Sequence, residues 1–302
     1  AEADYLYGLD APDGEDEDDE DPGDLDPGEA PEEDVFLALL SGLPEEVQEA
    51  YEGYGPDFQA GFTALHRGDF ALAATLLARA LDAHAHRDTY IPLPLATAYL
   101  NLDRGPEARE FLEGFRRRHP GVLPAWQLLC EIHWEAGEFD AAAALLADLP
   151  PELARSLAAT LLQGETLRRA GRAREARDLY REVLAAHGWH EGLARALAEV
   201  LEETGDAAGA RRLYRELMDR CTACRTRVDP AVRERYAELA FAAGDRDSAL
   251  LELYLTLARD LPASAARSFE RAAAICDHQG RASEAARFRA LASRAATPGS
   301  AG

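Results

Sequence analysis

The chain has 302 residues, enough for one large domain or two ordinary ones, and 47% of them are hydrophobic, which is typical of a folded protein with a sizeable core. Its formal net charge is -24, and residues 1–56 contain 21 of the 56 acidic residues and no basic one. The remainder has 35 acidic residues and 32 basic ones, all arginine, so it lacks the positive surface typical of proteins that bind nucleic acids or membrane surfaces.

Residues 1–34 are dominated by an acidic run rich in proline and glycine, which we expect to form a disordered or extended tail because like charges repel and few apolar residues are present. The sequence begins with Ala1, so either the initiator methionine was removed or the N-terminus was otherwise processed, and an export signal lost in that way is compatible with the sequence. Because no apolar run approaches the ~18 residues that span a bilayer, we expect a cytoplasmic chain without membrane insertion. The absence of lysine and the abundance of alanine, arginine and leucine indicate a GC-rich, bacterial genome.

Residues 35–53 alternate apolar and polar residues at helical spacing and predict two short amphipathic helices. A repeat then covers residues 54–295, in which a glycine, a turn and a helix with a fixed alanine recur, and residues 296–302 form a short C-terminal tail. The fixed alanines are Ala73, Ala108, Ala142, Ala176, Ala210, Ala249 and Ala285. Their spacings of 35, 34, 34, 34, 39 and 36 residues predict seven helix–turn–helix units.

These units resemble tetratricopeptide repeats, whose pattern combines Trp, Leu, Gly and Tyr in a first helix (helix A) with Ala and Phe in a second (helix B). The third unit carries Trp126, Leu129 and, in the small-residue position, Cys130, and the fifth carries Ala198, Ala210 and Tyr214. The resemblance implies an all-α fold, a right-handed α-solenoid of about seven such helix pairs, preceded by the acidic segment. Because one pair cannot bury its apolar face alone, stacked pairs share a continuous core.

In proteins of this family the A helices line a concave groove that holds another protein or a peptide segment. The resemblance therefore implies a set of partner-binding residues that is apolar and aromatic in the first units and charged in the later ones. This set is Phe58, Phe62, Leu65, Tyr90, Leu93, Asn101, Leu128, Trp134, Arg168, Arg169 and Arg195. Aromatic and arginine side chains are the usual anchors of protein interfaces, whereas the absence of lysine disfavours the type of repeat that clamps C-terminal carboxylates.

The acidic N-terminal segment suggests regulation of this groove. Residues 5–9 or 35–40 could fold back into its apolar end while the acidic run contacts Arg168, Arg169 and Arg195. The alternative interpretation is a tail that only keeps the chain in solution.

A second kind of function is suggested by Cys221 and Cys224, a CxxC pair between the fifth and sixth units. One such pair supplies half of the ligands of a structural zinc site, so three readings stay open: an incidental pair, a metal site completed elsewhere, and a disulfide or redox pair. Two histidine pairs, His84 with His86 and His187 with His190, could ligate a metal ion but are interpreted as solvent-facing loop residues.

No nucleophile elbow, phosphate-binding loop, dinucleotide fingerprint or HExxH motif is present, so we expect no enzyme activity and no cofactor. The sequence thus predicts a protein-binding scaffold or adaptor, with a metal- or thiol-redox-responsive regulator as the alternative.

Overall fold

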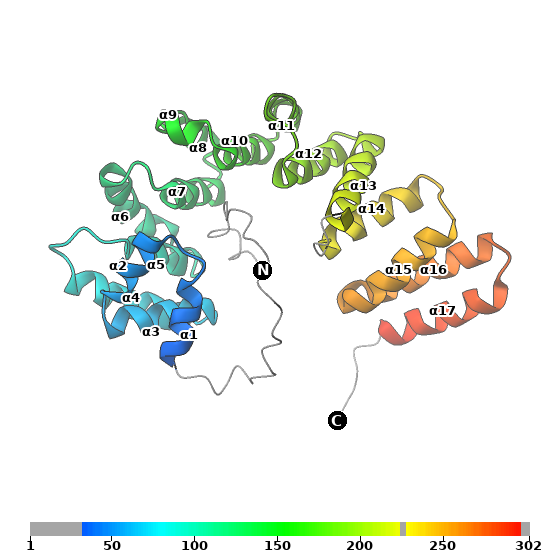
Figure 1. The fold of residues 1–302 in the computed structure, drawn as a ribbon, viewed down its shortest axis with the longest axis horizontal. Coiled ribbons are helices and arrows are strands. Elements are labelled where there is room, and N and C mark those ends of the chain that lie inside the picture. The colour runs from blue at the N-terminus through cyan, green and yellow to red at the C-terminus, as the bar shows by residue number, and fades with distance from the viewer. Residues whose placement is uncertain (1–31, 224–227, 297–302) are drawn as a thin grey trace. The chain divides into compact units, whose positions relative to one another are not determined.

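The computed structural model describes residues 32–223 and 228–296 (Figure 1). In these two ranges the chain is helical and contains no strand, which confirms the predicted all-α repeat fold. It divides into two compact units, residues 1–170 and 171–302. None of the described helices is both long and apolar enough to cross a bilayer.

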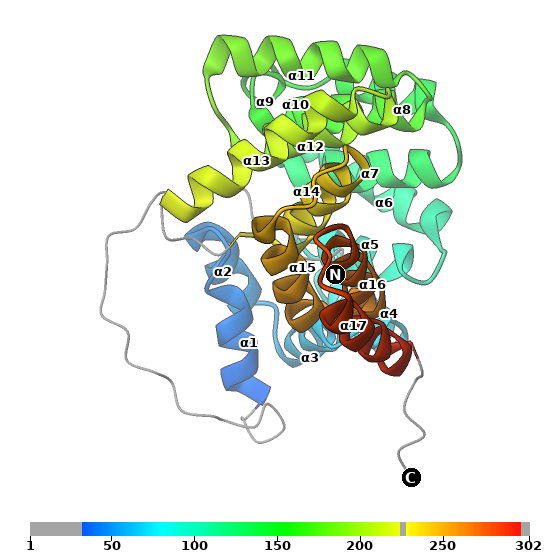
Figure 2. The same ribbon diagram turned by 90° about the vertical axis from the view of Figure 1, so that its right-hand side faces the viewer.

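The first unit begins with two short helices, which are followed by three helix pairs, one helical turn and a final helix. They are α1 (Glu32–Leu40), α2 (Glu45–Glu52), α3 (Pro56–His66), α4 (Phe70–Ala83), α5 (Pro92–Leu100), α6 (Gly105–Arg118), α7 (Leu123–Glu135), α8 (Phe139–Ala147), α9 (Pro151–Ala154) and α10 (Leu157–Arg169). Each helix from α3 to α7 packs against the next one in the chain, α8 packs against α10, and α1 packs along α3, as Figures 1 and 2 show from two directions. The A helices α3, α5, α7 and α10 also touch in succession, so the core runs through the unit.

The second unit continues the same alternation of A and B helices. Its elements are α11 (Ala173–His187), α12 (Glu191–Glu203), α13 (Ala207–Ala223), α14 (Pro230–Ala242), α15 (Ser248–Asp260), the 3-10 turn η2 (Pro262–Ser264), α16 (Ala265–His278) and α17 (Ala282–Ala295). Consecutive helices pack against each other along the whole unit. Six of the seven predicted pairs therefore each lie within one unit, α3–α4, α5–α6 and α7–α8 in the first and α12–α13, α14–α15 and α16–α17 in the second, whereas the helices predicted for the fourth pair, α10 and α11, end the first unit and begin the second.

The turn between the two helices of a pair depends on a residue with a positive φ angle. Gly68, Gly137, Gly171, Gly205, Gly244 and Gly280 hold this position with φ between 72° and 97°. In the second pair the same position is filled by Asp103, with φ of 57°, and the Arg104 N–H donates to the Tyr99 carbonyl to close the turn. Aspartate is among the few residues other than glycine that tolerate this conformation, so the turn survives without a glycine.

A small residue on the A helix allows the B helix to approach closely. Ala96, Cys130 and Ala198 on A helices are fully buried, as are Ala108 and Ala210 on B helices. Close approach leaves no space for larger side chains, which pack instead between neighbouring pairs. The small positions thus set the distance between the two helices of a pair.

The sixth pair corrects one sequence assignment. In the other six pairs the fixed alanine is the fourth residue of its B helix, and it is fully buried. Helix α15 instead begins four residues after Gly244, so its fourth residue is Leu251, which is 5% exposed, while Ala249 lies on the surface. Two additional residues in this turn shift the start of α15 along the sequence. Ala249, which was assigned from its spacing, is therefore not the core residue of this pair.

Gly61 in α3 provides a test of this close approach. A Cβ atom built there would lie 2.9 Å from Leu77 Cγ and 3.1 Å from the Leu77 backbone nitrogen on α4. We expect Gly61→Ala to lower the free energy of unfolding by about 1–3 kcal/mol, because the helices must separate to admit the methyl group. Urea denaturation monitored by circular dichroism measures this change.

Gly114→Ala is the matched control, since Gly114 also lies within a helix but its Cβ would meet only arginine side chains at 3.7 Å or more. There the higher helix propensity of alanine should stabilise the chain by about 0.5–1 kcal/mol. Equal effects of the two substitutions would contradict the packing argument.

Candidate functional site

The aromatic residues predicted for the apolar end of the groove belong to the core. Phe58 and Phe62 on α3 are both 0% exposed. The Phe36 ring of α1 lies 6.4 Å and 6.0 Å from their ring centroids, and the Tyr51 ring of α2 lies 4.7 Å and 5.2 Å from them. Helices α1 and α2 therefore cover this face of α3. The assignment of Phe58 and Phe62 as groove-lining residues is corrected, because the chain's own N-terminal helices occupy that surface.

The predicted leucines are core residues as well. Leu65, Leu93 and Leu128 are 7%, 4% and 2% exposed, and each is part of a buried apolar cluster. They fill the space between neighbouring helices, so their assignment to the partner-binding surface is also corrected. In that part of the predicted set, only Tyr90 and Asn101 reach the surface.

Both of these surface residues make polar contacts within the first unit. The Tyr90 hydroxyl donates to Glu46 Oε1 at 3.0 Å, which links the second pair to α2. The Asn101 side-chain amide donates to the Thr97 carbonyl at 2.8 Å and remains exposed at the end of α5. These contacts fix the orientation of two side chains that a partner could reach.

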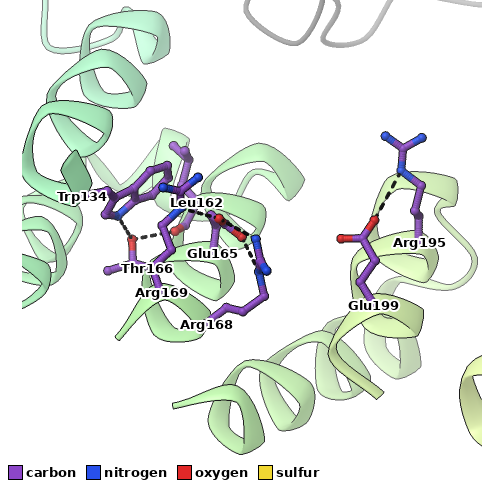
Figure 3. A network of polar contacts seen from close by, with 8 residues as sticks. All are labelled: Trp134, Leu162, Glu165, Thr166, Arg168, Arg169, Arg195 and Glu199. Carbon is purple, nitrogen blue, oxygen red and sulfur yellow. Dashed lines mark hydrogen bonds and ion pairs between the residues drawn. The ribbon is translucent and has the colours of Figure 1, made fainter. Parts of the chain in front are cut away.

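Trp134 lies at the other end of the first unit, in a network of side chains from α7 and α10 (Figure 3). Its indole N–H donates to Thr166 Oγ1 at 3.1 Å, and this hydroxyl donates to the Leu162 carbonyl at 2.8 Å. The Arg169 guanidinium lies over the indole ring, 4.8 Å from its centroid. Trp134 is 9% exposed as a result, and a partner would meet Arg169 first.

Glu165 holds the two predicted arginines of α10. Its carboxylate accepts hydrogen bonds from Arg168 at 2.7 and 2.8 Å and from Arg169 at 2.5 Å (Figure 3). One carboxylate is thus shared by the two guanidinium groups. Contact between these arginines and the acidic run of residues 10–34 is not tested, because most of that run lies outside the described residues.

In the second unit, the A helices are linked to one another by ion pairs. Arg195 of α12 contacts Asp229 at 2.7 Å, and Arg235 of α14 contacts Glu202 of α12 at 2.5 Å. Arg271 of α16 similarly contacts Glu238 of α14 at 2.8 Å. The two partners of each pair are 33 or 34 residues apart, one repeat length. The predicted residue Arg195 is therefore part of a periodic row of charges along the A helices.

A pocket of about 580 Å³ lies on this row, between α12 and α14. Its lining combines Arg195 and Arg235 with four carboxylates, those of Glu199, Glu202, Glu203 and Asp229. Tyr214 of α13 is also part of the lining, and its hydroxyl donates to Glu202 at 2.9 Å. Burial and then the nearby Glu202 raise the pKa of Tyr214, so the phenol stays protonated.

Position on the A helices predicts the inner face of the array for four of the lining residues, Arg195, Glu199, Glu202 and Arg235, and of these Arg195 was assigned to partner binding. One sequence feature could have drawn attention to Asp229: it directly precedes Pro230, and an aspartate before a proline commonly starts a helix. In the structure Asp229 caps α14, because its side chain accepts a hydrogen bond from the Ala231 N–H. Tyr214 was identified as a core residue of the fifth unit, and only the packing of α13 behind α12 brings it to the pocket.

The CxxC pair stays a prediction. Cys221 lies in the last turn of α13, but its side chain and the whole of Cys224 fall outside the described residues. Of the paired histidines, His84 ends α4 with Nδ1 2.9 Å from the Ala80 carbonyl, and His190 caps α12. In the described parts of the chain, no three His, Cys, Asp or Glu residues are placed to hold a metal ion together.

Comparisons with known proteins agree with this architecture. A tetratricopeptide repeat model matches residues 128–148, 157–182 and 192–216. A comparison with curated proteins gives no match.

Three solved structures illustrate the structural similarity. A thermophilic TPR protein of Thermus thermophilus is 22% identical, with a TM-score of 0.48 over 60% of this chain and 95% of that one. A tetratricopeptide repeat protein of Parabacteroides merdae is 15% identical, with a TM-score of 0.48 over 82% of this chain and 94% of that one. The structure of the APC/C hetero-tetramer Cut9–Hcn1 matches 87% of this chain and 52% of that one at 17% identity, with a TM-score of 0.52, which shows a shared fold.

The matched segments, the A and B helices with their small contact residues and the glycine turns lead to one conclusion: the chain contains tetratricopeptide repeats within residues 128–216.

Proposed function

We propose that the protein is a scaffold that binds a segment of another protein along the exposed faces of its A helices. The pocket between α12 and α14 is the observation that supports this proposal most directly. It is a concavity between consecutive A helices, lined by charged groups held in place by ion pairs, and pockets with a few oriented polar groups are the usual sites of recognition. The assignment to protein ligands rests on analogy with the fold family.

The surface that we assign to the partner is smaller than the sequence predicts. In the first unit it comprises Tyr90, Asn101 and the Arg168–Arg169 pair, and in the second unit it comprises the pocket with Arg195. These side chains are at least partly exposed and oriented by internal contacts, so little conformational entropy is lost when a partner binds them.

The acidic N-terminal segment would act on this surface as a competitor. With 21 acidic residues and no basic one in residues 1–56, it is complementary in charge to the arginines of the A helices. Residues 35–40 are not available to fold back into the groove, because Phe36 and Leu40 of α1 are core residues that are 1% exposed. Residues 5–9 lie outside the described residues, so the proposed competitor is the segment before α1, its acidic run together with residues 5–9.

The thiol-redox alternative concerns Cys221 and Cys224 alone. Cys130 and Cys276 are both fully buried. Burial raises the pKa of the Cys130 thiol to about 12 and also raises the pKa of Cys276. Because the thiolate is the reactive form, neither can take part in exchange at neutral pH in the folded chain.

A bulky side chain in the pocket tests the scaffold function. Ala231 is exposed in the first turn of α14 and lines the pocket, so Ala231→Trp should fill it without disturbing the core. We expect the full chain, used as bait in a lysate of the source organism, to retain one stoichiometric protein, and the variant to bind that protein about tenfold more weakly. Isothermal titration with the purified partner measures the difference.

Ala282→Trp is the matched control, since Ala282 is likewise exposed in the first turn of a helix, α17, but does not line the pocket. It should bind as the unmodified chain does. A partner that binds both variants equally well does not use the pocket, and the absence of any stoichiometric partner would contradict the scaffold function.

Replacement of the acidic residues between positions 10 and 30 by Asn and Gln tests the competition. This change keeps the length of the segment and removes only its charge. We expect partner affinity to rise several-fold, because the arginines no longer face a competing polyanion. If the titration shows unchanged affinity, the competition is contradicted and the segment is a tail that only keeps the chain in solution.

Alkylation with iodoacetamide at pH 7, read by peptide mass spectrometry, tests the thiol alternative. We expect label only on the peptide that contains Cys221 and Cys224 in the folded chain, and on all four cysteines after denaturation. A Cys221→Ser, Cys224→Ser variant should take up no label when folded. Label on Cys130 in the folded chain would contradict the burial argument. If the two cysteines of the CxxC are fully labelled and elemental analysis finds no bound metal, the result would count against a metal site.

A further inference from the structure

The outward side of α1 is apolar, although this helix begins the described part of the repeat array. Residues 35–40 of α1 are apolar without interruption, yet only Phe36 and Leu40 among them are buried. Leu37 is 47% exposed, Ala38 beside it is exposed as well, and Val35 is half-buried. Helices at the end of a repeat array normally present a polar outer face to the solvent.

The next helix, α2, shows how a solvated outer side is built in this chain. Its largest apolar residues, Val47 and Tyr51, pack in the core of the first unit. All of its exposed residues are glutamates, namely Glu45, Glu46, Glu49 and Glu52. The apolar outer side is therefore particular to α1, and a helix that is apolar on both sides is normally covered on both. In the described residues the side of α1 around Leu37 is not covered.

The segment that leads into α1 contains one apolar cluster. Four of the five large apolar side chains in residues 1–31 lie within residues 5–9, whose sequence is Tyr-Leu-Tyr-Gly-Leu. Residues 10–31 join this cluster directly to Glu32, where α1 begins. They include Pro-Gly dipeptides at 22–23 and 27–28, which are typical of turns and allow the chain to reverse its direction.

The dimensions of the cluster, the linker and the helix agree. The nine residues of α1 make a helix about 14 Å long, and five extended residues span about 17 Å, so residues 5–9 are long enough to lie along the whole helix. Residues 10–31 reach up to about 70 Å, which is ample for a return along α1. Such a linkage gives an effective concentration on the order of millimolar, which a second copy or another protein would have to exceed in solution.

We propose that residues 5–9 dock on the outward apolar side of α1, with Leu37 at the centre of the contact. The inference rests on the proposed competition by the N-terminal segment and names the place where that segment is anchored. Docking of residues 5–9 makes residues 10–31 a loop that is fixed at both ends. Less conformational entropy is then lost when the acidic run is placed on the arginines of the first unit.

A photoreactive benzoylphenylalanine in place of Leu37, in the full chain, reports what covers α1. Digestion at aspartate releases residues 4–9 as one peptide and residues 34–56 as another, so mass spectrometry identifies a cross-link between them. We expect this cross-link within one chain. Irradiation in about 0.5 M NaCl screens the attraction between the acidic run and the arginines and leaves the apolar contact in place.

The matched control carries the photoreactive residue in place of Leu72 of α4, which is also 47% exposed, and should give no cross-link to residues 4–9. A second variant removes the apolar side chains of the cluster by Tyr5→Ser, Leu6→Ser, Tyr7→Ser and Leu9→Ser. It should lower the cross-link yield at position 37 by about fivefold or more, because the side chains that the contact would bury are lost. Leu25→Ser should leave the yield unchanged.

Three results would overturn the proposal: no cross-link from position 37 to residues 4–9, equal cross-linking from positions 37 and 72, or cross-links that join two chains when isotopically labelled and unlabelled protein are mixed. The second result would indicate a non-specific apolar attraction, and the third would place a second copy on α1. The competition itself is tested separately by the Asn and Gln replacements described above, because they measure partner affinity and not the position of residues 5–9.

Discussion

Close contact between the two helices of each pair is the constraint on which the rest of the structure depends. Where the helices cross, the chain places glycine, alanine or cysteine on the A helix and, in all pairs but the sixth, alanine as the fourth residue of the B helix. The separation of the helices then follows from backbone contact, as Gly61 illustrates, where an added Cβ atom would approach Leu77 to 2.9 Å. The larger side chains have space only between pairs, and this makes each pair dependent on its neighbours.

This constraint also determines which side chains remain for a partner. Aromatic residues on the first A helices are needed to fill the gap between α3 and the two short helices before it, so Phe58 and Phe62 are buried. Charged residues on the later A helices point away from the crossing and bind one another across repeats. What is left for recognition is mainly polar and already oriented, which favours selectivity through charge over adhesion through a large apolar patch.

The fold was predictable from the sequence because its determinants are local and periodic. A positive-φ glycine, a small residue and a helical apolar pattern recur at about 34 residues, and each is visible without knowledge of contacts. The binding surface was less predictable, because the sequence of an A helix does not reveal whether other helices of the same chain cover a given position. Phe58 illustrates this, since only the position of α1 makes it a core residue.

Deviations from the repeat were the other source of error. Asp103 takes the place of the turn glycine, which a glycine-based pattern cannot detect, and two additional residues before α15 bring Leu251 to the position expected for Ala249. The pocket lay beyond the sequence analysis for a different reason. It requires Tyr214 from a B helix and Asp229 from a helix cap to meet residues of α12, and no local pattern encodes that meeting.

The row of ion pairs with partners 33 or 34 residues apart restricts how this chain can change in length. An insertion of one residue within an A helix turns every later side chain by about 100°, so the arginines beyond it would lose their carboxylates. Insertion or loss of a whole repeat leaves each arginine facing an equivalent neighbour. Duplication and deletion of complete repeats are therefore the changes that this part of the chain tolerates in its evolution, and small insertions belong in the turns.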